Sequence, residues 1–229
     1  MKRLFFTYII CCFTTAIFAQ GDYDLVIVGG TPGGIMTAIA AAREGKTSVL
    51  LERTAHFGGL PANGLGATDI ATRKATTGLF KEFVDRVLAH YVSKYGKDSE
   101  QVKVCSDGYH FEASVAEQVF TDMLAEQKNK ITVLKMRQFD AEPRNIEMKN
   151  DVIVAIRILN RETRQIETYT GKVFVDATYE GDLGAAAKSP FRLGREGKSE
   201  FNEPGAGVVY KYWGGAEQDC SAFQADNAV

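Results

Sequence analysis

The sequence predicts an α/β fold with a parallel sheet, and its first ordered segment carries most of that prediction. A short apolar run at Asp24–Val28 ends in glycines, an alanine-rich segment follows at Gly34–Arg43, and a second apolar run occupies Lys46–Leu51. Strand, tight turn, helix and strand within about 30 residues is the size of a parallel βαβ crossover. The composition, 45% hydrophobic and 24% charged over 229 residues, is that of an ordinary globular protein.

Beyond this unit, apolar periodicity predicts two helices. Apolar residues at helical spacing predict a helix over Gly78–Tyr95, and a capping box formed by Ser114 and Glu117 predicts the start of another. The buried face expected for this second helix consists of Val115, Val119, Phe120, Met123 and Leu124. The stretch His56–Thr77 has no sustained period and is expected to be a long ordered loop.

Four apolar runs in the second half of the chain predict strands. They are Ile131–Met136, Val152–Leu159, Ile166–Thr170 and Lys172–Asp176. The polar residues 160–165 between the second and third runs favour a hairpin. We therefore expect a β-hairpin or meander inserted at about residues 151–171. After Gly184 the periodicity weakens, and the sequence contains no internal repeat.

The first nineteen residues have the layout of a secretory signal peptide. Lys2 and Arg3 precede an apolar run over residues 4–18, which ends at the small residue Ala19. The run is shorter than the about 20 residues of a membrane span, although an uncleaved N-terminal anchor is the alternative. We expect export to the periplasm or the exterior, with Gln20 as the new N-terminus and no stable membrane span after cleavage.

Charge and cysteine content argue against several kinds of partner and site. The formal net charge is −2 and the basic residues are scattered, so nucleic acid is not expected as a partner. Cys105 and Cys220 lie far apart in the mature chain and are expected to be unpaired thiols. The three histidines and these two cysteines show no metal-ligand spacing, so no metal site is expected.

The segment GGTPGG at Gly29–Gly34 has the spacing of a dinucleotide-binding loop. A helix N-terminus offers free N–H groups and a partial positive charge to an anionic diphosphate. Gly29 permits the tight turn out of the strand, and Gly34 lets the helix pack closely on it. Thr31 replaces the second glycine of the usual GxGxxG pattern, and its hydroxyl can donate to a phosphate oxygen.

A carboxylate at the end of the second strand supports the nucleotide interpretation. Glu52 stands where an acidic residue can accept hydrogen bonds from both ribose hydroxyls. The alternative is a charged residue that merely ends a strand at the surface. This pattern alone serves FAD and NAD equally.

Three stretches of the sequence, in this order, resemble those of FAD-dependent oxidoreductases of the glutathione-reductase-like fold, and most of all a secreted bacterial branch. They are residues 24–52, HFGGLPANGLGATD at 56–69 and KVFVDATYEGDLGAAA at 172–187. The resemblance implies a Rossmann-like FAD/NAD(P)-binding domain at 20–187, after the signal peptide at 1–19, with the hairpin as its β-meander. Residues 188–229 are then expected to begin an incomplete substrate or cap domain.

The resemblance also implies FAD as the cofactor and assigns its contacts to three loops. The residues expected to bind it are Gly29, Gly30, Thr31, Pro32, Gly33, Gly34, Glu52, Arg53, Gly58, Gly59, Ala177 and Thr178. The first glycine loop would face the pyrophosphate, Glu52 the adenosine ribose, and Gly58 with Gly59 would let the second loop pass close to the cofactor. Tyr179 stands where a glycine is commoner in such proteins.

The expected function is flavin-mediated hydride or electron transfer on a small, polar or sugar-like substrate. Such proteins contact FAD a second time after a substrate domain, so we expect this chain to be the N-terminal portion of a longer enzyme. Two alternatives stay open: an NAD-binding dehydrogenase, against which Gly58 and Gly59 argue, and a non-catalytic nucleotide-binding remnant.

No catalytic residue is assigned from the sequence, although several side chains are candidates by chemical type. They are His56, Tyr109, His110, Glu180, Asp182 and Arg195. For His110 a packed or capping role is preferred, and for Glu180 and Asp182 the role of acidic charges at a helix N-terminus. The beginning of a substrate pocket, or else an ordinary interdomain surface, is expected at Arg192, Arg195, Tyr210, Lys211, Tyr212 and Trp213.

Overall fold

The computed structural model describes residues 19–192, 194, 196–204, 206, 208–210 and 222–224. The chain divides into two compact units, at residues 1–188 and 189–229. Nearly all of the predicted signal peptide lies outside the described residues. Among the helices of the described part, none has both the length and the apolar character needed to cross a membrane.

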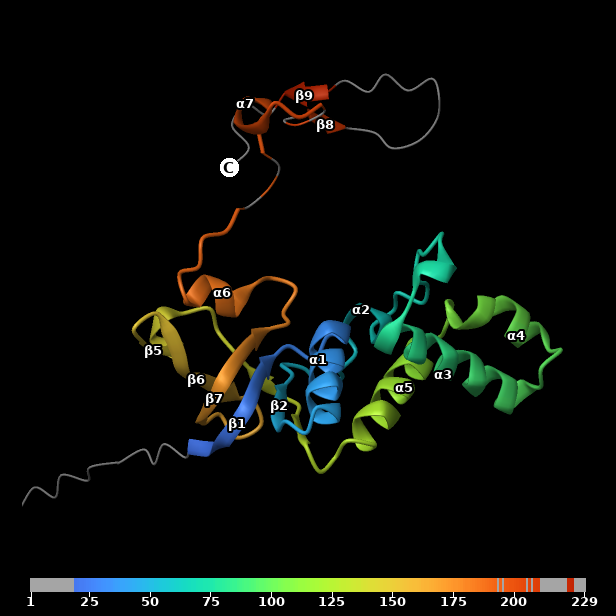
Figure 1. Ribbon diagram of the computed structural model, residues 1–229, viewed down its shortest axis with the longest axis horizontal. Coiled ribbons are helices and arrows are strands. Elements are labelled where there is room, and N and C mark those ends of the chain that lie inside the picture. Colours follow the sequence, from blue (N-terminus) through green and yellow to red (C-terminus); the bar gives the residue numbers. More distant parts are fainter. Residues whose placement is uncertain are drawn as a thin grey trace, which may run out of the picture. The chain divides into compact units, whose positions relative to one another are not determined.

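The first unit is built around a seven-stranded sheet with the spatial order β3-β2-β1-β7-β6-β4, in which β5 also pairs with β6 (Figure 1). The strands are β1 (Ala19–Val28), β2 (Ser48–Leu51), β3 (Ile131–Leu134), β4 (Arg137–Gln138), β5 (Ile146–Lys149), β6 (Val152–Asn160) and β7 (Ile166–Asp176). The four strands β3, β2, β1 and β7 are parallel, whereas β6 runs antiparallel to β7, β5 and β4. This confirms the predicted α/β fold with a parallel sheet and an antiparallel meander.

The helices of the first unit follow the predicted order, with short additions. They are α1 (Pro32–Arg43), α2 (Gly59–Ala62), α3 (Gly78–Tyr95), α4 (Glu100–Val104), α5 (Ala113–Ala125) and α6 (Asp182–Ala186), with 3-10 turns at Arg73–Ala75, Ser106–Gly108 and Pro143–Asn145. The bounds of α3 are those that the periodicity predicted. The expected loop at 56–77 contains α2 and one 3-10 turn.

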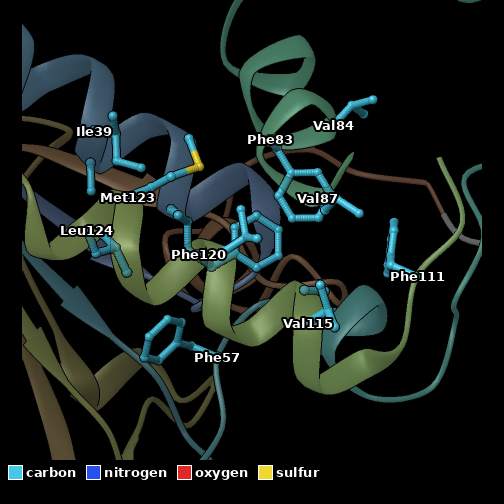
Figure 2. Close-up of a cluster of buried hydrophobic side chains, with 14 of the residues drawn as sticks. Ile39, Phe57, Phe83, Val84, Val87, Phe111, Val115, Phe120, Met123 and Leu124 are labelled. Carbon is cyan, nitrogen blue, oxygen red and sulfur yellow. The ribbon is translucent and has the colours of Figure 1, made fainter. Parts of the chain in front are cut away.

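One face of the parallel sheet is covered by α1, α3 and α5. Ile27 and Leu50 point from the strands into a cluster that also contains Ile39 of α1. Figure 2 shows Phe83 of α3 beside Phe120 of α5 in this cluster, and their rings stack with centroids 4.5 Å apart. The cluster therefore holds three helices on the sheet mainly through apolar contact.

The opposite face of the parallel sheet packs against the meander and α6. Val26 and Val49, the chain neighbours of Ile27 and Leu50, share a second cluster with Ile156, Tyr169 and Leu183. Alternate residues of β1 and β2 thus enter different clusters, because successive side chains of a strand point to opposite faces. Burial on both faces explains why these strands are continuous apolar runs.

The predicted capping box at Ser114 and Glu117 is wrong. Helix α5 begins at Ala113, its N-cap residue is Glu112, and no side chain caps it. The hydroxyl of Tyr91 accepts a hydrogen bond from the Glu112 N–H at 3.0 Å. The Tyr91 hydroxyl, which comes from α3, therefore pairs with the N–H of the N-cap residue. A local sequence pattern contains no signal for such a contact.

The two strands predicted at Ile166–Thr170 and Lys172–Asp176 are one continuous strand, β7. Its first half pairs with β6, and it also pairs with β1 up to Asp176. Gly171, which stands between the two predicted strands, lies against β1, and a Cβ there would be 2.7 Å from Val26 Cγ2. The glycine marks a close approach of two strands and not the end of one.

The second unit contains α7 (Lys198–Phe201) and the antiparallel pair β8 (Val208–Tyr210) and β9 (Ala222–Gln224). Arg192 forms an ion pair with Glu200 at 2.6 Å, and its guanidinium lies 4.9 Å from the centre of the Phe201 ring. Of the residues expected to begin a substrate pocket, Arg195, Lys211, Tyr212 and Trp213 lie outside the described residues, as does the side chain of Tyr210.

Candidate functional site

Three loops meet at the carboxyl ends of β1, β2 and β7. In the sheet register Val28 lies opposite Leu51 on one side and Asp176 on the other, so the loops that follow these residues leave the sheet at the same edge. Between them is a cavity of about 330 Å³, within the usual range of small-molecule sites. This is where open α/β sheets bind their ligands.

The cavity brings together half of the residues predicted to bind the cofactor. Its lining includes Gly29, Thr31, Glu52, Arg53, Gly59 and Thr178. The other six support these from behind or beside the wall: Gly30, Pro32, Gly33, Gly34, Gly58 and Ala177. All twelve belong to the three loops or to the first turn of α1.

The glycines of the first loop are required by close backbone contacts. Gly29 has φ +107°, and a Cβ there would lie 2.5 Å from the Ala177 carbonyl oxygen. A Cβ on Gly34 would lie 2.1 Å from the Gly29 carbonyl oxygen. Gly33 differs, because a Cβ there would meet only the Thr31 Oγ1, at 3.7 Å. Turn and helix packing therefore explain Gly29 and Gly34, as predicted, but not Gly33.

Thr31 is the N-cap residue of α1. Its hydroxyl donates to the Ala177 carbonyl at 2.8 Å and accepts from the Gly34 N–H at 3.4 Å. A hydroxyl has one hydrogen to donate, so this contact competes with the expected donation to a phosphate. In the first turn of α1, Pro32 has no N–H, and the N–H groups of Gly34 and Ile35 donate to Thr31. The N–H group that this turn can offer to an anion is therefore that of Gly33.

The carboxylate of Glu52 is the central polar group of the site. Its side chain is 8% exposed, one oxygen accepts from the Gly30 N–H at 2.8 Å, and the other accepts from the N–H and hydroxyl of Thr54 at 2.7 and 2.8 Å. A carboxylate has about four acceptor positions. The Thr54 hydroxyl has a single hydrogen, which goes either to Glu52 or to the His56 carbonyl, so at least one acceptor position of the carboxylate is left for a ribose hydroxyl.

Gly30 owes its identity to the same carboxylate. A Cβ on this residue would lie 2.7 Å from Glu52 Oε2, so any side chain would push away the acceptor of the Gly30 N–H. The glycine loop and the acidic residue therefore form one hydrogen-bonded unit. Sequence reasoning treated them as two separate signals.

The third loop is held by a network at the start of α6. The two oxygens of Asp176 accept from Thr178 and from the Gly184 N–H, and the Thr178 hydroxyl accepts from the Gly181 and Asp182 N–H groups. These bonds satisfy the exposed N–H groups of the α6 N-terminus. Asp182 lies in the first turn of α6, where an acidic residue was expected.

The acidic side chains of this loop differ in their surroundings. Burial, together with the nearby carboxylates of Glu180 and Asp176, raises the pKa of Asp182 above its ordinary value. Glu180 is half exposed and forms a loose ion pair with Arg53 at 3.6 Å. Both acidic residues line the cavity.

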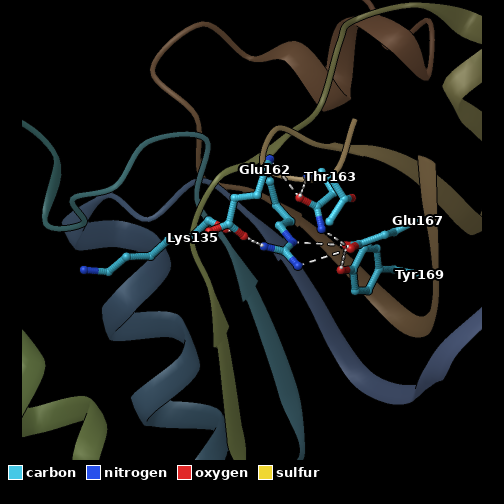
Figure 3. A network of polar contacts seen from close by, with 7 residues as sticks. Lys135, Glu162, Thr163, Glu167 and Tyr169 are labelled. Carbon is cyan, nitrogen blue, oxygen red and sulfur yellow. Dashed lines mark hydrogen bonds and ion pairs between the residues drawn. The ribbon is translucent and has the colours of Figure 1, made fainter. Parts of the chain in front are cut away.

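A buried polar network begins at the cavity and extends into the meander (Figure 3). The guanidinium of Arg137, which lines the cavity, contacts both oxygens of Glu167 at 3.1 Å and Glu162 at 2.8 Å. The Asn160 amide and the Tyr169 hydroxyl donate to the same Glu167 carboxylate. Sequence reasoning missed this network, because its members come from β4, β6, β7 and the turn that joins the last two.

Of the side chains considered for catalysis, His56, Glu180 and Asp182 line the cavity, whereas Tyr109 and His110 do not. His56 lines the cavity, and its Nδ1 lies 2.9 Å from Glu117 Oε2. Tyr109 is buried elsewhere, with its hydroxyl 2.6 Å from the Thr76 hydroxyl oxygen. His110 is exposed and pairs through its backbone with Ala67, before α5. Arg195 lies outside the described residues.

Cys105 is a free, buried thiol that donates to the Val102 carbonyl at 3.2 Å, and Cys220 lies outside the described residues. Within the part of the chain that the structure describes, no three His, Cys, Asp or Glu side chains gather as metal ligands do.

The three loops, the capped first turn of α1 and the carboxylate at the end of β2 define a dinucleotide-binding α/β protein. A family model described as FAD dependent oxidoreductase matches residues 24–227. The chain therefore belongs to the FAD-dependent oxidoreductase family, and its cofactor is FAD. The geometry fits this cofactor, since the backbone of Gly29 and Gly59 and the N-cap residue Thr31 line the cavity beside the Glu52 carboxylate.

One solved structure shares the fold at low identity, and two others are similar to this chain to a lesser degree. BexE, studied for oxidation during BE-7585A biosynthesis, is 19% identical with a TM-score of 0.50, over 77% of this chain and 36% of that one. Glycerol-3-phosphate dehydrogenase from Bacillus halodurans, complexed with FAD, is 16% identical with a TM-score of 0.49, over 75% and 37%. L-proline dehydrogenase from P. horikoshii is 14% identical with a TM-score of 0.49, over 76% and 58%. The match thus spans 36–58% of these three chains.

Proposed function

We propose that this chain is the FAD-binding part of an enzyme that transfers a hydride or electrons to or from a small molecule. The observation that carries the proposal is the contact between the Glu52 carboxylate and the Gly30 N–H beside the cavity. It joins the ribose acceptor to the diphosphate loop in one unit, as a dinucleotide requires. FAD, when bound, supplies the redox chemistry, and the protein supplies binding, orientation and electrostatics.

Each loop has a separate task in this proposal. The N-terminus of α1 holds the diphosphate with the Gly33 N–H, because the helix dipole favours negative charge there. Glu52 accepts a ribose hydroxyl through its free acceptor position. The second glycine loop and the turn after β7 bound the cavity on its other sides. The family match favours FAD over the NAD and remnant alternatives.

The finer points are also proposals. The order of the three loops supports the glutathione-reductase-like branch, and the charged and apolar pattern of residues 1–19 supports export by a signal peptide. A polar or sugar-like substrate is supported by the basic and aromatic residues of the second unit, such as Arg192. Nothing in the described residues assigns a catalytic acid or base.

A cofactor titration tests the proposal. The purified wild-type protein, stripped of bound cofactor, is titrated with FAD, followed by flavin fluorescence, and separately with NADH, followed by the fluorescence of its reduced nicotinamide. We expect binding of one FAD and much weaker binding of NADH. A folded protein that binds NADH but not FAD, or that binds neither dinucleotide, would overturn the proposal.

Glu52→Gln supplies the residue-level test. The substitution keeps the side-chain volume but removes the charge and one acceptor, so FAD affinity should fall by about tenfold to a hundredfold, the usual effect of losing a hydrogen bond to a charged group. Glu44→Gln is the matched control, because Glu44 is exposed at the end of α1. Unfolding of both FAD-free variants separates the loss of binding from a loss of stability.

A further inference from the structure

We propose that Tyr179 is a positioning residue that holds the second glycine loop, Gly58–Leu60, against the first turn of α1 and so keeps the cofactor cavity closed on that side. This inference rests on the proposed function, in which the cavity holds FAD. Tyr179 lines the cavity, and its side chain is 57% exposed.

The backbone that carries Tyr179 is firmly anchored. Ala177 N–H donates to the Val28 carbonyl at 2.8 Å, and the Ala177 carbonyl accepts from the Thr31 hydroxyl. The next residue, Thr178, donates its N–H to Asp176 at 3.0 Å. Tyr179 therefore projects from a turn that is bonded to β1, to the α1 N-cap and to the end of β7.

The Tyr179 side chain reaches the second loop across 119 sequence positions. Its hydroxyl accepts a hydrogen bond from the Leu60 N–H at 2.7 Å. A Cβ on Gly59 would lie 2.2 Å from this hydroxyl oxygen and 2.9 Å from Cδ of Pro32, the first residue of α1. The backbone of Gly59 is thus enclosed between the phenol and the start of α1.

The two ends of the second loop are held in different ways. At the inner end, the Gly58 N–H donates to the Gly30 carbonyl at 2.6 Å, and a Cβ on Gly58 would lie 2.8 Å from the Phe120 ring. At the outer end, where the Leu60 side chain is exposed, Tyr179 supplies the hydrogen bond. Loss of Tyr179 should therefore release the outer end while the core contacts of Gly58 persist.

This arrangement gives Tyr179 a specific effect on the cofactor. A loop already held in place loses little conformational freedom when FAD binds, and it must move before FAD can leave. Tyr179→Phe removes the hydrogen bond but keeps the ring beside Gly59, so we expect FAD release to become about threefold to tenfold faster. Tyr179→Ala removes both contacts and should have the larger effect.

The experiment measures the FAD dissociation rate of the full chain by stopped-flow fluorescence and the thermal midpoint of the FAD-free protein. Tyr95→Phe, a partly exposed tyrosine on α3, is the matched control. We expect faster release in both Tyr179 variants, an unchanged rate in the control, and a thermal midpoint close to that of the wild type. A wild-type release rate in both Tyr179 variants would overturn the inference.

A second variant tests the contact itself. Gly59→Ala places a methyl group where the Tyr179 hydroxyl lies, so it should speed FAD release. Because Gly59 also has φ +57° and lies against Pro32, the substitution should retain part of its effect in the Tyr179→Ala background, but less than in the wild type. Fully additive effects would overturn the inference. Hydrogen exchange of the backbone amides in the FAD-free protein tests the contact without the cofactor. The Leu60 N–H should exchange slowly in the wild type and faster in Tyr179→Phe.

The outcomes separate the two proposals. If the wild type fails to bind FAD, the proposed function fails, and amide exchange at Leu60 still decides whether Tyr179 holds the loop. If the wild type binds FAD but the Tyr179 variants behave as the wild type does, only the positioning role is lost.

Discussion

The two faces of the parallel sheet are stabilised in different ways. On the helical face, Ile27 and Leu50 share a mainly apolar cluster with Phe83 and Phe120, and the ion pair between Arg43 and Glu82 joins α1 to α3 beside it. On the meander face, apolar residues such as Ile156 lie beside the buried network of Arg137, Glu167 and Tyr169. Apolar contact is not directional, whereas a hydrogen-bonded ion pair has a defined geometry.

The location of the Arg137–Glu167–Tyr169 network indicates what the meander face contributes to the site. Arg137 lines the cavity and also binds Glu167, so the meander contributes a charged wall whose position is fixed by bonds to β6 and β7. The helical face reaches the site through the N-cap of α1, through Phe120, which packs behind Gly58, and through Glu117 of α5, which contacts His56. We infer that the helical face supplies most of the apolar packing and that the meander face adds a buried polar network at the site.

The largest effect is expected on the helical face, from Phe120→Ala. Phe120 is 1% exposed and stacks on Phe83, so its loss should lower the free energy of unfolding by about 3–5 kcal/mol. Urea unfolding of the FAD-free protein measures it. Leu65→Ala, at a side chain that is 56% exposed, is the control and should change stability by about 0.5 kcal/mol or less. Equal effects at the two sites would contradict this account of the helical cluster.

The next effect is expected on the meander face, from Glu167→Gln. The substitution keeps the shape but leaves Arg137 with only Glu162 as a carboxylate partner, so we expect a loss of about 2–4 kcal/mol, near the range for breaking a buried pair. Urea unfolding at neutral pH gives the value. Glu147→Gln on the exposed β5 is the control. A loss below about 1 kcal/mol would mean that the network adds little to stability.

The wild type and Glu167→Gln also allow a test of pH dependence. Burial opposes ionisation of Glu167, but hydrogen bonds from Tyr169, Arg137 and Asn160 outweigh it and hold its pKa below the ordinary 4.5. A lowered pKa in the folded state means that this carboxylate stabilises the protein above pH 4.5 and loses that effect as the pH falls through the folded pKa. The stability difference between wild type and Glu167→Gln should therefore shrink on acidification below pH 4.5, and a constant difference would refute it.

The smallest effect is expected at Ser114. A true N-cap residue is worth about 1 kcal/mol, but Ser114 is exposed inside α5 and caps nothing. Ser114→Ala should leave the free energy of unfolding within about 0.5 kcal/mol of wild type, because alanine also favours the helix. A decrease of about 1 kcal/mol or more in the free energy of unfolding, measured with urea, would show that Ser114 caps the helix after all.

Much of the fold was predictable because its signals are local. Helix α3 has the predicted bounds, since its apolar period continues from Gly78 to Tyr95. The parallel unit was recognisable from its apolar runs and glycines. By contrast, β5 was not predicted: three of its four residues are exposed, and its pairing with β6 decides its conformation. The short helix α4 was missed for the related reason that it has no buried face.

The site was predictable to a similar degree. The three loops were found from their residue types, and the structure brings them to one cavity. Arg137 and Tyr179 were missed as cavity residues, although Tyr179 was noted as an unusual residue in place of glycine. Their positions depend on partners far away in the sequence, Glu167 and Leu60.

By itself, the sequence determined the βαβ unit, the glycine loop, the carboxylate at Glu52 and the family, because each is encoded in a run of neighbouring residues. Only the tertiary structure decided that α5 begins at Ala113, that Glu52 binds the Gly30 N–H and that Tyr179 bonds to Leu60. The physical reason is the same in the three cases. A donor and an acceptor from separate segments become partners only after the sheet has placed those segments side by side.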